Sequence, residues 1–215
     1  MRLIQRQEMW LPTFQGWLYI LLFLSTLIVF FVTHIHPFLA PVSPIKSEIL
    51  VVEGAMGDKF LKKAITEFEK GGYQKLITTG LPLPHGFYVT GYNTFADLAA
   101  ATLLKLGFDQ EKLVAVPAPD VIINRTSSSA RAVLQWIAKA NLPVKSINLY
   151  SLDVHTRRSW LIYQKIFAPD LQVGVIASEP FDYDPKSWWT SSGGVRSIIA
   201  EGIAYIYARF FDWRT

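Results

Sequence analysis

The chain has 215 residues, no cysteine and a formal net charge of +4, and 51% of its residues are hydrophobic. This length suits one ordinary domain plus an appendage. The lack of cysteine excludes disulfides, thiol catalysis and cysteine-based metal sites. The basic residues are spread along the chain without a run of five. This argues against nucleic acid as a partner, because clustered Lys and Arg are its usual footprint.

The first predicted element is an uncharged apolar run at residues 17–32, WLYILLFLSTLIVFFV. With its neighbours it reaches about 20 residues, the length of a helix that crosses a bilayer. A buried core helix is the alternative, but the run has no polar face at helical spacing. No convincing cleavage site follows it. We therefore interpret residues 1–36 as a cytoplasmic N-terminus and a transmembrane signal anchor.

The charges on either side of this anchor predict its orientation. Arg2, Arg6 and Glu8 precede it, whereas Lys46 and Glu48 follow only after a proline-rich stretch. The positive-inside rule then predicts a single-pass protein of the plasma (inner) membrane with an extracytoplasmic C-terminal domain. Residues 37–47 contain three prolines and are expected to form a stiff linker.

Residues 48–215 alternate between short apolar runs and longer stretches with helical spacing. The predicted strands are 48–54, 75–80, 112–119, 145–151 and 171–178, and the predicted helices are 58–72, 93–107, 127–141, 156–168 and about 193–211. Consecutive apolar positions are typical of strands buried on both faces. The pattern predicts an α/β domain, a Rossmann-like three-layer sandwich with a mostly parallel sheet. The last helix is apolar enough to suggest membrane contact, although packing against the core is favoured.

Ligands of open parallel sheets bind outside the carboxyl ends of the strands, so the residues that follow each predicted strand are the site candidates. They are Glu53, Gly54 and Asp58 after the first strand, Gly80 at the second, Arg125, Thr126, Ser128 and Ser129 after the third, and Ser151, Asp153, His155 and Arg158 after the fourth. A helix that begins near such an edge offers an anion site at its N-terminus.

The stretch LYSLDVHTRRSW, residues 149–160, has two interpretations. In the first it borders an anion-binding crevice, because His155 and Arg158 lie one helical turn apart and can reach the same group. In the second, Ser151 or Asp153 caps the following helix and the arginines lie on a solvated face. The spacing does not decide between them.

Two segments also carry a family resemblance. NRTSSSA opens one predicted helix and SLDVHTRRS precedes the next, an order that resembles the YdcF/SanA/ElyC-like family. Thr126 matches the first residue of that family's T-x-E-N-A helix start, with Ser128 and Ser129 where Glu and Asn are usual. His155 and Arg158 match its H-x-x-R segment. The resemblance covers most of residues 48–180.

The resemblance implies a Rossmann-like domain on a membrane anchor and a role in the bacterial cell envelope, in peptidoglycan-precursor or lipid-carrier metabolism. It fixes no cofactor. Serine cannot act as a general acid or base near neutral pH, so acid–base chemistry would need His155 with Glu53, Asp58 or Asp153. The predicted substrate-binding residues are Gly54, Gly80, Arg125, Thr126, Ser128, Ser129, Ser151 and Arg158.

Together these features predict a membrane-anchored envelope protein that binds an anionic metabolite, such as a phosphate-bearing lipid carrier or a nucleotide-like group. In the enzyme hypothesis it also transforms this ligand, as a hydrolase or transferase. The alternatives are ligand binding without chemistry and a non-catalytic interaction protein of an envelope complex that docks through surface aromatics such as Trp188. The scattered histidines predict no metal site.

Overall fold

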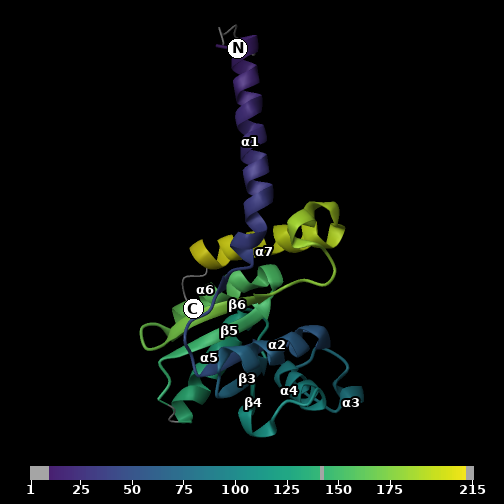
Figure 1. The fold of residues 1–215 in the computed structure, drawn as a ribbon, viewed down its shortest axis with the longest axis vertical. Coiled ribbons are helices and arrows are strands. Elements are labelled where there is room, and N and C mark those ends of the chain that lie inside the picture. The colour runs from purple at the N-terminus through teal and green to yellow at the C-terminus, as the bar shows by residue number, and fades with distance from the viewer. Residues whose placement is uncertain (1–9, 141–142, 212–215) are drawn as a thin grey trace, which may run out of the picture. The chain divides into compact units, whose positions relative to one another are not determined.

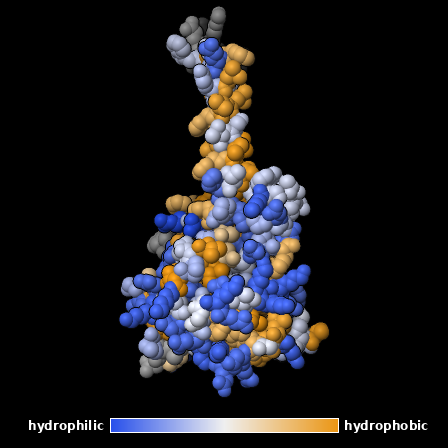
Figure 2. Space-filling view, in the orientation of Figure 1, coloured by the Kyte–Doolittle hydropathy of each residue, from blue (hydrophilic) through white to orange (hydrophobic). Residues whose placement is uncertain are grey.

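A computed structural model describes residues 10–140 and 143–211 and divides the chain into two units, Met1–Ile35 and His36–Thr215 (Figure 1). Most of the first unit is the helix α1, Phe14–Leu39, which is long and apolar enough to cross a membrane. None of its most apolar window is buried, and Figure 2 shows hydrophobic side chains along the helix. A buried core helix does not fit this exposure. Arg2, Arg6 and Glu8 lie outside the described residues, so the orientation stays a prediction.

The predicted linker, residues 37–47, is only partly a linker. The helix α1 continues through Pro37 to Leu39, whose side chain is fully buried. The strand β1, Val42–Ser43, then pairs antiparallel with the edge of the sheet, with Val42 opposite Ile176. Two residues are too short a run to show strand periodicity, so sequence patterning could not have found this strand.

The second unit contains a six-stranded sheet in the order β1-β6-β5-β2-β3-β4. Apart from β1, all neighbouring strands are parallel. The parallel strands are β2 (Ile49–Glu53), β3 (Lys75–Gly80), β4 (Leu113–Pro117), β5 (Ser146–Leu152) and β6 (Gln172–Ser178). The prediction of an α/β domain with a mostly parallel sheet is confirmed, and each predicted strand is present within two residues of its expected bounds.

Helices cover both faces of this sheet. α2 (Asp58–Gly71) and α4 (Phe95–Lys105) pack on one face, and α5 (Arg125–Lys139) and α6 (Thr156–Phe167) pack on the other. Along β2, Ile49 and Val51 face α5 and α6, whereas Leu50 and Val52 face α2 and α4. Successive residues of a strand point to opposite faces, so the consecutive apolar run fills both halves of the core.

The remaining helices lie outside these two layers or in the loops. α7 (Ser192–Phe210) packs on α6, and the short elements are α3 (Phe87–Thr90), η1 (Gln110–Lys112), η2 (Asp153–His155) and η3 (Pro185–Thr190). Thr94 caps α4, because its hydroxyl accepts a hydrogen bond from the Asp97 N–H at 3.1 Å. α5 begins two residues earlier than predicted, at Arg125. The predicted end of this helix, Asn141, lies outside the described residues.

The order of the strands in the sheet determines where the candidate site lies. From β2 the chain runs outward through β3 and β4 on one side, and later through β5 and β6 on the other. The chain direction therefore switches between the neighbours β2 and β5, where the loops that follow the two strands diverge and leave a crevice at the carboxyl edge. Glu53 ends β2, and Ser151 is the penultimate residue of β5.

Candidate functional site

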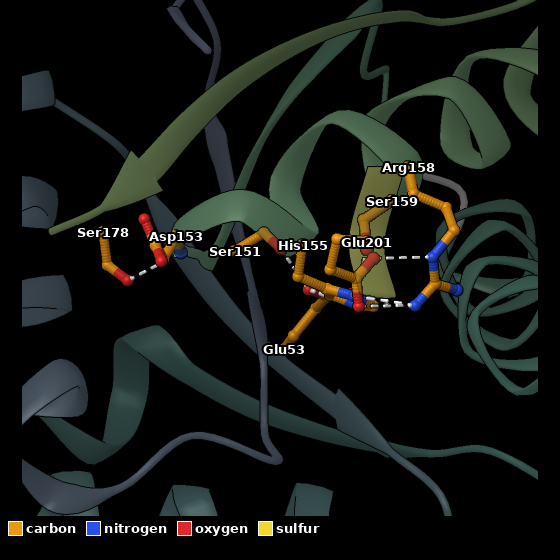
Figure 3. A network of polar contacts seen from close by, with 8 residues as sticks. All are labelled: Glu53, Ser151, Asp153, His155, Arg158, Ser159, Ser178 and Glu201. Atoms are coloured by element: carbon orange, nitrogen blue, oxygen red, sulfur yellow. Dashed lines mark hydrogen bonds and ion pairs between the residues drawn. The ribbon is translucent and has the colours of Figure 1, made fainter. Parts of the chain in front are cut away.

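Glu53 is the carboxylate at the centre of this edge. It falls two positions after Val51, so the strand alternation turns it toward α6. The Ser151 hydroxyl donates a short hydrogen bond to its Oε2, and the Ser159 hydroxyl donates to its Oε1 at 2.8 Å. Both serines are fully buried. Two hydroxyl donors therefore fix the orientation of the Glu53 side chain (Figure 3).

His155 lies between Glu53 and a second carboxylate, Glu201 of α7 (Figure 3). Its Nδ1 is 3.0 Å from Glu201 Oε1, and its Nε2 is 3.9 Å from Glu53 Oε2. A carboxylate only accepts hydrogen bonds, so Nδ1 donates to Glu201 when it carries a proton, as it does in the imidazolium; when it carries none, it can accept from Arg158 Nη2, which lies 2.9 Å away. The bond to Glu201 fixes the plane of the ring and turns Nε2 toward Glu53.

Arg158 completes the cluster one helical turn after His155. It donates two hydrogen bonds to Glu201, from Nε to Oε2 at 2.9 Å and from Nη2 to Oε1 at 3.1 Å. This is the bidentate fork that guanidinium and carboxylate groups form in close pairs. Arg158 was predicted to bind the ligand directly. In the structure these two nitrogens hold Glu201, and Nη2 also lies 2.9 Å from His155 Nδ1.

The cluster shifts the pKa values of its members in opposite directions. Burial acts to lower the pKa of His155, but the charge of Glu53 and the hydrogen bond to Glu201 outweigh it, and the net pKa is raised above 6.5. Burial acts to raise the pKa of Glu201, but its bonds to His155 and Arg158 prevail and lower it to about 2. The cluster therefore favours the protonated form of His155 and the charged form of Glu201.

A crevice of about 790 Å³ opens beside this cluster. It lies between the carboxyl ends of the strands, the start of α5 and the middle of α7. Glu53, His155, Arg158 and Glu201 line its polar part. Its apolar rim consists of Ile122, Ile123, Ile203 and Tyr207, all of them exposed. The crevice therefore combines charged residues in its interior with apolar residues around its opening.

The N-terminus of α5 supplies the opposite polar wall. Arg125, Thr126 and Ser127 form its first turn and line the crevice. Asn124, which precedes them, makes no capping side-chain bond, so the first N–H groups of α5 receive no cap from it. No carboxylate in the described part of the chain lies within ion-pair distance of Arg125.

Two buried hydroxyls in the crevice wall have no hydrogen-bond partner among the described residues. They are Ser127 Oγ, on a residue that is 4% exposed, and Thr79 Oγ1, on a residue that is 1% exposed. A buried hydroxyl without a partner costs free energy, about 1–3 kcal/mol. Both residues line the crevice, but the two oxygens themselves are inaccessible from it.

Gly54 and Gly80 line the crevice, but packing explains why they are glycines. A Cβ at Gly54 would lie 2.5 Å from the Phe95 carbonyl oxygen, and one at Gly80 would lie 2.6 Å from the Phe95 Cβ. The segment that opens α4 therefore presses directly on both strand ends. Neither glycine is needed to let a ligand approach the backbone.

The predicted site residues fall into three groups. Those that line the crevice are Glu53, Gly54, Gly80, Arg125, Thr126, Ser129, His155 and Arg158. Ser151 supports Glu53 from below, and Ser128 is buried and donates to the Pro119 carbonyl at 3.2 Å. Asp58 is exposed in the first turn of α2 and does not line the crevice.

Asp153 belongs to a different network. Its Oδ1 is 2.9 Å from His36 Nε2, its Oδ2 accepts a short hydrogen bond from the Tyr183 hydroxyl, and its N–H faces Ser178 Oγ at 3.4 Å. Figure 3 shows it turned away from the His155 cluster. Neither Ser151 nor Asp153 caps α6, so the capping interpretation of this stretch is wrong.

Glu201 is the functional residue that the sequence analysis missed. It lies 46 residues after His155, inside a helix that was assigned to packing. The sequence offered one signal for Glu201, since it is the only acidic residue in the largely apolar stretch of residues 193–211. An acidic residue on the buried side of such a helix requires a partner, because an unpaired buried charge is costly.

Comparisons with known proteins assign no family or function to this chain. The chain matches no protein-family model and no curated protein sequence. The family resemblance therefore rests on its motif residues alone. Within residues 10–140 and 143–211, no three metal-ligating side chains converge on one point.

Proposed function

We propose that the protein is a membrane-anchored enzyme that binds a phosphate-bearing metabolite with an apolar portion and cleaves or transfers its phosphate group. One observation carries the proposal. A half-buried imidazole held by a carboxylate and a helix N-terminus without a side-chain cap line the same crevice. The first is a proton donor and the second is an anion site.

The polar wall of α5 supports an anionic ligand. The N–H groups at the start of α5 and the Arg125 guanidinium offer donors to phosphate oxygens. The apolar rim suits a hydrocarbon or aromatic portion of the same ligand. A phosphate-bearing lipid carrier combines both properties, and a nucleotide-like group is the second choice.

The proposed chemistry uses His155 as a general acid. In hydrolysis, a water oxygen attacks phosphorus while the ester P–O bond breaks, and His155 Nε2 gives its proton to the leaving oxygen. The proton that the water loses returns to the neutral imidazole and closes the cycle. Glu53 and Glu201 hold the imidazolium, and Arg158 holds Glu201. In transfer, an acceptor hydroxyl takes the place of the water.

The cellular setting is part of the same proposal. The strand order of β2 to β6, numbered from β2, is 3-2-1-4-5, which is the Rossmann order and supports that description of the fold. The H-x-x-R residues of the YdcF/SanA/ElyC-like motif, His155 and Arg158, are both in the cluster. These features support an envelope protein anchored by α1 in the plasma (inner) membrane with its domain outside.

Ligand-induced stabilisation tests the proposal. The full chain in lipid nanodiscs would be unfolded by heat with inorganic phosphate, ADP, S-adenosylmethionine or geranyl phosphate, since a ligand that binds only the folded state raises the melting temperature. We expect geranyl phosphate to raise it in the wild type and in Arg131→Ala, and not in Arg125→Ala. Arg131 is the matched control, because it is an exposed arginine of the same helix outside the crevice lining.

A second candidate, a non-catalytic interaction protein, is favoured by exposed aromatics such as Trp189; Trp188, which the sequence suggested for this role, is buried. The same experiment separates the two. If no phosphate compound stabilises a folded wild type, while Trp189→Ala alone disturbs its assembly with envelope proteins, the interaction hypothesis prevails and the enzyme proposal fails.

A further inference from the structure

The helix α7 carries two apolar faces. One face packs on the domain through Gly194, Ile198 and Ala208, which are buried. The other is exposed and consists of Ile199, Ile203, Ile206, Tyr207 and Phe210. These five residues recur every third or fourth position, so they form one stripe of roughly 17 Å along the helix. We call this stripe the outer face of α7.

Single exposed hydrophobic residues are ordinary, but a contiguous stripe of this size marks an interaction site. Each of the five side chains is more than half exposed. Two cations, Arg196 and Arg209, are exposed on the same helix, Arg196 one turn before the stripe begins and Arg209 at one side of its C-terminal end. An apolar stripe accompanied by arginines is the pattern of helices that lie in a membrane interface.

α7 and the end of the predicted membrane span are close along the chain. The apolar unit ends at Ile35, and the residues that follow are fixed to the domain. The Phe38 ring packs edge-on against Tyr205 of α7 with a centroid distance of 5.4 Å, and Leu39 is fully buried. Phe38 lies only three residues beyond Ile35, which is about 5 Å of helix. The end of the predicted span is therefore only a few residues of chain away from a contact with the middle of α7.

We propose that the outer face of α7 docks on the lipid bilayer as an interfacial helix. The domain is then held by two membrane contacts, the α1 span and the α7 outer face, and not by the span alone. Ile203 and Tyr207 belong both to this face and to the rim of the crevice. If the proposed function holds, a docked α7 opens the crevice toward the lipid, and a phosphate ligand with a hydrocarbon chain enters from the membrane plane.

The lack of native cysteine allows a direct test. The full chain with a single Ile206→Cys substitution would carry an environment-sensitive fluorophore in phosphatidylcholine–phosphatidylglycerol vesicles. The matched control is Gln135→Cys, at an exposed position of α5. Quenching is measured separately with doxyl-labelled lipid and with iodide on both sides of the membrane. Each labelled variant must melt at the wild-type temperature.

We expect lipid quencher to remove about half or more of the Ile206→Cys fluorescence, because interfacial helices bury their apolar face to about 5–10 Å. Iodide should quench only Gln135→Cys. Iodide quenching of Ile206→Cys to the level of the control would overturn the proposal, since the face would be in water. Protection from both quenchers would also overturn it, in favour of a second copy of the chain on this face. No phosphate ligand is present, so the result is independent of the proposed enzyme activity.

Discussion

Two histidine–carboxylate pairs lie close together in this domain, and they differ in what surrounds the ring. His155 bonds Glu201 and turns its other nitrogen toward Glu53 at the crevice. His36 bonds Asp153, which also holds the Tyr183 hydroxyl, and both side chains of that pair are about nine-tenths buried. Asp153 and His155 are two residues apart but belong to opposite networks. Both histidines are paired with a carboxylate, so the pairing itself does not distinguish the two sites. The proposed reactive site differs from the structural one because a ligand can reach the second ring nitrogen of its histidine.

The largest difference should appear in turnover. If the enzyme proposal is right, His155→Gln should lower the rate of phosphate release from geranyl phosphate about 10²–10⁴-fold, the range for loss of a general acid. His36→Gln should retain turnover in the folded protein, because His36 does not line the crevice. Phosphate release is measured under saturating ligand. If both variants lost the same share of the phosphate-release rate, the two histidine–carboxylate pairs would not differ in function.

The free energy of unfolding should depend more on the His36–Asp153 pair than on the His155–Glu201 pair. Asp153→Ala leaves His36 and the Tyr183 hydroxyl without their common acceptor in a buried site. We expect the free energy of unfolding to fall by about 3 kcal/mol. Asp153→Asn is the matched control, because it keeps an acceptor oxygen and tolerates the positive φ of this position, 41°. Urea unfolding measures both variants, and an unchanged midpoint for Asp153→Ala would refute a structural role.

The His155 cluster should also set a pH window of stability. The folded pKa of Glu201 lies at about 2, below its ordinary 4.5, so its contribution of at most about 3 kcal/mol is lost as pH falls from 4.5 toward 2. The folded pKa of His155 lies above 6.5, so its contribution is complete below pH 6.5 and is lost as pH rises through the folded pKa. Unfolding free energies across pH should therefore be highest between these limits. Glu201→Gln should flatten the acid side, and an unchanged acid limb would contradict the pairing.

The smallest expected effect concerns the glycine at the crevice floor. Gly54→Ala places a Cβ 2.5 Å from the Phe95 carbonyl oxygen. The resulting overpacking should cost about 1–3 kcal/mol of unfolding free energy. Gly57→Ala is the control, because the Cβ would meet only Phe60 at 4.0 Å. Chemical denaturation of both variants decides the matter. Equal stability would mean that Gly54 is not a packing residue.

The sequence was sufficient to predict the local features of the fold and site. Strand ends and the period of two place Glu53 at the carboxyl edge, and the one-turn spacing brings His155 and Arg158 together. It was insufficient wherever a distant segment decides the outcome. Glu201 reaches His155 from 46 residues away. The positive φ of Asp153 turns it away from its neighbour His155, although Asp rarely adopts this backbone region.

The outer face of α7 shows the same limit. Residues 193–211 look like one broad apolar pattern, because two apolar faces overlap along one helix. The sequence therefore favoured packing over membrane contact. Only the three-dimensional arrangement separates the face that packs from the face that remains exposed.

The most direct test of the central claim is the NMR titration of His155 in the full chain with isotope-labelled histidine, with His155→Gln to assign its signal. We expect a pKa above 6.5 in the free protein, and a further rise when geranyl phosphate binds, because a nearby phosphate charge favours the imidazolium. A His155 pKa that does not respond to geranyl phosphate, at concentrations that saturate the melting-temperature shift, would place the ligand outside this crevice and contradict the account.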